Sequence, residues 1–164
     1  MLQLEFRKNE TGAMLVYTRP DGTSTWSKSG EFFVLHDLVH LAVESAFGFK
    51  EAFFGLIAQG RTILSFEDKV PGSHEHQQLP DEAYLAELIV GHLDNMRHSP
   101  EPHDYPLDNQ IRRSASEANL ALSEGYERKL HTAVIVMSDL HQEWRSLPVG
   151  QALKKSFPLP IAVP

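Results

Sequence analysis

His36 and His40 are the residues whose type and spacing most clearly suggest chemistry, with Asp37 between them and Glu44 one turn further on. In an α-helix, residues four apart lie on the same face, so the two imidazoles can reach one metal ion together. Imidazole nitrogens suit zinc and the neighbouring divalent transition metals. We therefore predict that His36 and His40 are metal ligands, with zinc or another divalent transition metal as the cofactor.

One helix cannot supply the whole site, because the eight residues between His36 and Glu44 span about 12 Å along a helix axis. We predict that the third ligand is His92, which projects among apolar side chains of a later helix. The histidines of the polar loop at 74–76 are the alternative source, since loops over a rigid scaffold often complete a site.

The acidic neighbours of the two histidines are the candidate catalytic residues. Glu44 follows His40 by one turn and can hold the imidazole in one tautomer and orientation. Asp37 or Glu44 would steer a metal-bound water, whose pKa a metal lowers. We therefore predict catalytic roles for Asp37 and Glu44.

Two short resemblances accompany these residues. The string from His36 to His40 resembles the H-E-x-x-H motif of zinc peptidases, with Asp37 in place of glutamate. Because Asp is one methylene shorter, and a displacement of about 1 Å can cost ~100-fold in rate, peptidase chemistry is disfavoured. The string from Val34 to Asp37 is similar to the core of the HD-domain phosphohydrolases. That family has a further metal-binding histidine on an earlier helix, whereas no histidine precedes His36, so we reject the assignment.

Composition narrows the classes of function. The 164 residues include nine histidines and no cysteine, which excludes disulfide frameworks, thiolate nucleophiles and cysteine-ligated metals. The net charge of −7 repels phosphate backbones and anionic membranes, so we expect neither nucleic acid nor a membrane as a partner. No apolar run approaches the roughly 18 residues of a membrane helix, and no signal peptide is evident. We expect a cytoplasmic protein whose ligand is an unidentified small molecule or peptide.

The elements that must position the histidines follow from local patterns. Residues 2–28 alternate as three antiparallel strands, and 151–157 can return to pair with them. Helices are predicted at 31–47, 51–59, 81–97 and, with a break at Gly125, 108–145. Residues 61–66 have the character of an edge strand. The prediction is an α+β fold, a single domain over 1–164 with an N-terminal meander packed on four to five helices.

The helix at 126–144 carries an apolar seam with spacings of 4, 3, 4, 3 and 4, which indicates lengthwise packing on another helix. Its members are Tyr126, Leu130, Ala133, Met137, Leu140 and Trp144. The side chains of this seam would pack either in the core of the chain or in the interface of a homodimer. On the 81–97 helix, the face with Glu87, Asp94 and His98 is predicted to be a solvated surface.

Two functions remain in competition. The first is a metal-binding domain, in the sharper form a metal-dependent hydrolase that uses His36 and His40. The second is a non-enzymatic binding or interaction module in which the histidines are structural and internally paired. Metal content would distinguish them, because only the first requires an ion.

Overall fold

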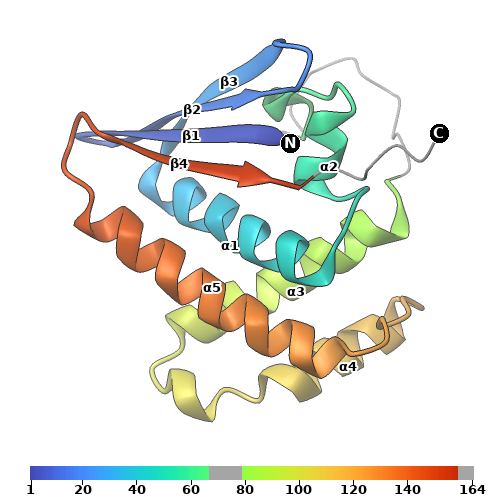
Figure 1. Cartoon of the computed structure of the whole chain (residues 1–164). Helices are drawn as coiled ribbons and strands as arrows, with labels where there is room; N and C mark the ends of the chain where they lie inside the picture. The colour runs from blue at the N-terminus through green and yellow to red at the C-terminus, as the bar shows by residue number, and fades with distance from the viewer. Residues whose placement is uncertain (67–78, 159–164) are drawn as a thin grey trace, which may run out of the picture.

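The computed structural model describes residues 1–66 and 79–158, and it has an α+β fold (Figure 1). Four antiparallel strands form one sheet in the order β3-β2-β1-β4. The strands are β1 (Leu2–Asn9), β2 (Gly12–Thr18), β3 (Ser24–Gly30) and β4 (Ala152–Phe157). The predicted meander is confirmed, and so is the pairing of the C-terminal strand, which joins β1 in antiparallel register.

Strict alternation explains why one face of this sheet is buried. In β1, Leu2, Leu4 and Phe6 are at most 1% exposed, and Leu4 stands opposite Tyr17 of β2. Residues between them point to the other face, where Trp26 of β3 is 61% exposed. The β2-β3 turn uses Gly22 at φ 85°, a conformation that suits glycine. The sheet thus offers one apolar face to the helices.

Five α-helices and two short 3₁₀ turns complete the described part of the chain. The helices are α1 (Glu31–Phe47), α2 (Phe53–Ala58), α3 (Asp81–His98), α4 (Leu107–Glu117) and α5 (Tyr126–Ser146). The 3₁₀ turns are η1 (Ile63–Phe66) and η2 (Pro102–Asp104). None of the helices within 1–66 and 79–158 combines the length and the apolar character that a membrane crossing needs.

The predicted edge strand at 61–66 is wrong, because Ile63–Phe66 is a 3₁₀ turn packed beside β3. The backbone N–H of Ile63 donates to the hydroxyl of Thr25, 3.1 Å away, and not to a strand ladder. The helical region predicted over 108–145 is interrupted over more residues than the expected break at Gly125, because α4 ends at Glu117 and α5 begins at Tyr126, after Gly125 in a left-handed conformation.

Helix α1 lies at the centre of the molecule, with the sheet on one side and α3 and α5 on others (Figure 1). It begins and ends where the sequence predicted, at Glu31 and Phe47, and Gly48 closes it with φ 72°. Its burial on most sides explains why few polar residues are tolerated there. The histidines therefore lie on a rigid, central element.

The seam of α5 packs within the chain, lengthwise against α1. All six of its members are buried, with exposed fractions between 0 and 7%. These side chains therefore belong to the core. A homodimer through helix 126–144 stays a prediction, and it would need another face of that helix.

Candidate metal centre

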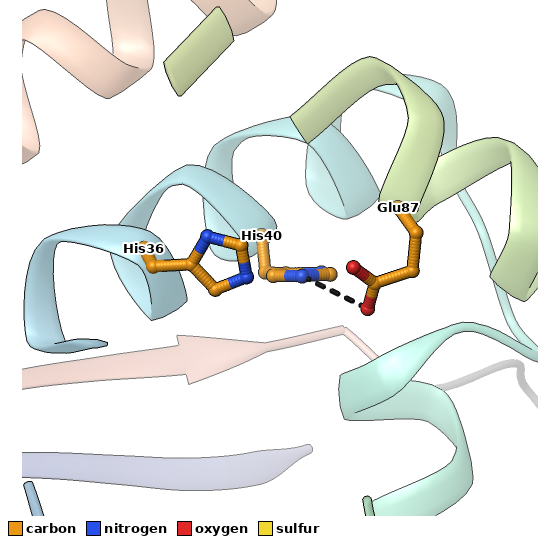
Figure 2. A group of neighbouring side chains, drawn as sticks. All are labelled: His36, His40 and Glu87. Carbon is orange, nitrogen blue, oxygen red and sulfur yellow. Dashed lines mark ion pairs between the residues drawn. The ribbon is translucent and has the colours of Figure 1, made fainter. Parts of the chain in front are cut away.

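Three side chains from two helices converge where α1 faces α3. Figure 2 shows His36 and His40 on α1 and Glu87 reaching toward them from α3. One nitrogen or oxygen from each lies within 4.8 Å of the others. His40 Nε2 and Glu87 Oε1 are 3.2 Å apart. Two imidazoles and one carboxylate are a donor set that can hold a metal ion.

Each histidine is oriented by a further carboxylate on its other ring nitrogen. His36 Nδ1 lies 2.7 Å from an oxygen of Asp94, and His40 Nδ1 lies 3.1 Å from an oxygen of Glu44. When Nδ1 carries the proton and donates it, Nε2 presents a lone pair to a metal. Carboxylates that bond the far nitrogen in this way are typical of metal-ligating histidines.

The two orienting carboxylates are themselves held in place. Glu44 is fully buried, and its second oxygen accepts the backbone N–H of Phe54 at 3.0 Å. Asp94 also accepts a hydrogen bond of 2.8 Å from Arg97, one turn later on α3. Partial burial raises the pKa of Asp94, but His36 and Arg97 outweigh it and lower this pKa below its usual value. Asp94 is therefore a carboxylate at neutral pH.

The charge balance around His40 favours a proton when no metal is bound. Burial alone would lower the pKa of His40, but hydrogen bonds and negative charge from Glu44 and Glu87 raise it to about 10. The pKa of Glu87 is lowered, because His40 and His36 outweigh its own desolvation. Burial raises the pKa of Glu44 in spite of His40 beside it. The two carboxylates thus favour a positive charge on His40.

Asp37 lies beside this group without belonging to it. Its carboxylate accepts a hydrogen bond of 2.8 Å from the hydroxyl of Tyr17, a buried residue of β2. Burial raises the pKa of Asp37, although the positive charge of His40 and the bond from Tyr17 oppose this shift. Asp37 therefore stands between the sheet and the two histidines, within electrostatic reach of both.

The centre is open on one side. The side chain of Glu87 is 55% exposed and that of His36 is 28% exposed, whereas His40 is only 2% exposed. Aromatic rings flank the two imidazoles: Phe32 stacks parallel to His36, and Phe53 packs against His40. The histidines are thus held by the carboxylates on their Nδ1 atoms, and the cluster is accessible to solvent from the side of Glu87.

The predicted third ligand, His92, is not part of this group. Its Nδ1 lies 3.2 Å from the hydroxyl of Tyr105 and its Nε2 2.9 Å from the hydroxyl of Ser114, on α4. His92 therefore links α3 to α4, and Glu87 takes the third position beside His36 and His40. The alternative source at 74–76 lies outside the described residues.

Only part of the α3 face that we expected to be solvated is exposed, because Asp94 contacts His36 on α1, whereas Glu87 and His98 are exposed. Glu87 and Asp94 stand two turns apart on this face, and Asp94 is only 9% exposed. One signal could have found them: small or apolar residues, Ala83 and Val90, stand one turn before and after Glu87 and are buried.

Comparisons with protein-family models, with curated proteins and with solved structures find no match to this chain. Within residues 1–66 and 79–158, His36, His40 and Glu87 form the one group of three or more potential ligands this close together. The chemistry of the centre therefore rests on these three side chains and their neighbours.

Proposed function

We propose that this protein is a metal-binding domain in which His36, His40 and Glu87 hold one divalent transition metal ion, zinc first, and use it in hydrolysis. The observation that carries this proposal is the carboxylate on Nδ1 of each histidine, Asp94 for His36 and Glu44 for His40. This arrangement leaves both Nε2 atoms for a metal, in the manner of known metal-ligating histidines.

The spacing of the ligand atoms supports the proposal. Zinc–nitrogen bonds of 2.0–2.1 Å in a tetrahedron place ligand atoms about 3.3 Å apart. The three atoms here lie within 4.8 Å of one another, so they must approach by about 1.5 Å at most. Because His40 and Glu87 are already 3.2 Å apart, this movement would involve His36, and the side chains of His36 and Glu87 are both partly exposed.

The electrostatics support a cation in the same place. A metal ion would replace the proton that Glu44 and Glu87 favour on His40, since a ligating imidazole must be neutral. Asp94 and Glu44 remain to balance the ionic charge. Binding should therefore release protons and become tighter as the pH rises.

Hydrolysis is the use that three protein ligands favour. Structural zinc sites usually have four protein ligands, whereas catalytic sites keep one position for water. A metal ion held by the three residues would lower the pKa of the water bound in that open position and would polarise the carbonyl oxygen of a substrate. Asp37 would accept the proton of the attacking water, and the hydroxyl of Tyr17 would hold its carboxylate in place. Glu44 would orient His40 and take no proton.

The second candidate is a non-enzymatic module in which the same contacts only join α1 to α3. It is favoured by the ring nitrogens of His40, both of which already have carboxylate partners, Glu44 and Glu87. In that case the cluster would make the packing of α1 on α3 specific, and the protein would not bind added metal.

Metal analysis separates these two functions. Protein purified without a histidine tag would be analysed for metal content and titrated with zinc by calorimetry. We expect one zinc per chain in the wild type and none in His36→Ala/Glu87→Gln, which keeps the buried His40–Glu44 pair. His103→Ala/His131→Ala removes two exposed histidines outside the cluster and is the matched control, with unchanged stoichiometry.

Absence of zinc binding by the folded wild type would overturn the metal proposal and leave the structural module. Equal binding by the wild type and by His36→Ala/Glu87→Gln would show that the metal sits elsewhere. Hydrolysis is tested by activity of the zinc-loaded protein against ester and amide substrates, with Asp37→Asn expected to lose activity while retaining zinc.

A further inference from the structure

Aromatic side chains stand on both sides of the two histidines. The ring of Phe32 lies parallel to that of His36, with 6.4 Å between centroids and 14° between planes. Phe53 lies 5.4 Å from the ring of His40 and in turn packs edge to face on Phe66, at 4.9 Å. The surroundings of the proposed metal position are therefore apolar as well as carboxylate-rich.

Two phenylalanines at the start of α1 are exposed to an unusual degree for their size. Phe32 and Phe33 open helix α1, are 55 and 59% exposed, and contact each other edge to face at 5.4 Å. Phe32 also lies 6.2 Å from the ring of His98. Adjacent exposed aromatics beside a polar centre mark a binding surface more often than single exposed residues do.

The charges around the centre oppose an anionic ligand. Four carboxylates surround the histidines, namely Asp37, Glu44, Glu87 and Asp94. Among the contacts of the described residues, the one guanidinium at this cluster is Arg97, which is already paired with Asp94 at 2.8 Å. A bound divalent ion leaves the group close to neutral or negative. Phosphate esters and other polyanions would find no free cation there.

Building on the metal site proposed above, we infer that its substrate is an uncharged carbonyl compound with an aromatic or apolar group. The carbonyl oxygen would meet the metal at the open position beside Glu87. The apolar group would pack on the exposed rings of Phe32 and Phe33, one turn before His36 on α1. The aromatic surface and the excess of carboxylates thus select for the same class of molecule.

Two hydroxamates test the aromatic part on the zinc-loaded wild type. Benzohydroxamate and acetohydroxamate chelate zinc through the same atoms and differ only in a phenyl in place of a methyl group. We expect calorimetry to show benzohydroxamate binding at least about tenfold more tightly, because a phenyl ring gains both apolar contact and edge or stacking interactions with the phenylalanines. Phenylphosphonate carries the same ring on a group of higher negative charge than the hydroxamate, which chelates zinc as a monoanion, and it should bind more weakly than benzohydroxamate.

Variants locate the preference. In Phe32→Ala/Phe33→Ala the ratio of the two hydroxamate affinities should fall to about threefold or less, with the affinity for acetohydroxamate unchanged. Trp26→Ala is the matched control, because Trp26 is equally exposed, at 61%, but lies on the outer face of the sheet. The ratio should not change in this control.

The outcomes distinguish this inference from the metal proposal. If no zinc binds, the metal proposal itself fails. If zinc binds and the two hydroxamates bind equally well to the wild type, the metal proposal stands and the aromatic subsite is refuted. Tighter binding of phenylphosphonate than of benzohydroxamate would refute the uncharged class. The wild-type comparison needs no variant and holds even where a variant fails to fold.

Discussion

Helix α1 meets its two helical neighbours in opposite ways. Against α5 the contact is built on an apolar seam, and among the described residues its one polar link joins His141 Nε2 to the backbone carbonyl of Leu35, at 3.0 Å. Against α3 it contains two histidines and the carboxylates Glu87 and Asp94. The apolar contact needs only periodicity, whereas each buried polar group needs a particular partner. The second contact is therefore where a specific chemistry can arise.

The largest expected effect tests the apolar contact. Trp144 of α5 is fully buried beneath the ammonium of Lys8, which lies 5.0 Å from its ring. Trp144→Ala should lower the free energy of unfolding by about 3–5 kcal/mol through the cavity it creates. Urea denaturation measures this loss. The zinc stoichiometry of the protein that remains folded should be unchanged, and a loss of zinc binding in that fraction would break the separation of the two contacts.

Removing one partner from the polar contact should cost somewhat less. His40→Leu leaves the carboxyl group of Glu44 buried and without its imidazole partner, which should lower the free energy of unfolding by about 3 kcal/mol. Adding Glu44→Gln neutralises that group and keeps an oxygen for the backbone N–H of Phe54. The double variant should therefore be more stable than His40→Leu alone in the same denaturation experiment. Additive losses would contradict this account of the cluster.

A change outside the metal ligands should affect affinity without affecting the fold. Asp94→Asn removes the charge that holds His36 through Nδ1 and should weaken zinc binding about 10–100-fold. Calorimetric titration measures the affinity, and thermal unfolding checks the fold. Asp139→Asn, an exposed change on α5, is the matched control. Equal affinities in the two variants would show that Asp94 does not orient a ligand.

The smallest expected effect is that His40 and His141 contribute to the free energy of unfolding with opposite pH dependences. The pKa of His40 is raised to about 10 between Glu44 and Glu87, so its stabilisation is complete below its ordinary pKa of about 6.5 and is lost as pH rises toward 10. Burial, with Arg97 and Arg145 nearby, lowers the pKa of His141 in spite of the Leu35 carbonyl and Asp94. Its contribution is therefore lost as pH falls below about 6.5.

Leucine variants of the two histidines test this difference in metal-free protein. The difference in free energy of unfolding between wild type and His40→Leu should shrink by on the order of 1 kcal/mol or more between pH 7 and pH 10. The difference between wild type and His141→Leu should shrink between pH 7 and pH 5. If these two differences in free energy of unfolding changed with pH in the same direction, the contacts of α1 with α3 and α5 would not differ electrostatically.

Most of the architecture was predictable because its signals are local. The alternation of Leu2, Leu4 and Phe6 and the turn at Gly22 specify the meander, and Gly48 ends α1 where it was expected. The weak strand character of 61–66 misled the prediction, because burial of Ile63 in a 3₁₀ turn beside β3 overrides β propensity.

The candidate site was predictable only on one of its two helices. His36, His40 and the pairing of His40 with Glu44 follow from helical spacing within α1. The roles of Asp37 as proton acceptor and of the trio as ligands stay predictions. Glu87 replaced His92 because α3 packs on α1 through one face and on α4 through another, and the sequence does not say which face meets which helix.

The sequence by itself determined the strands, the limits of α1 and the stripe of ionisable groups along it, because these depend on residues a few positions apart. The tertiary structure decided which residues contact this stripe of ionisable groups on α1. The rotation of α3 about its own axis brings Glu87 and Asp94 to the histidines and turns His92 toward Ser114 on α4. That rotation is set by how all the side chains of three helices fit together, a sum of many weak contacts between residues distant in the chain.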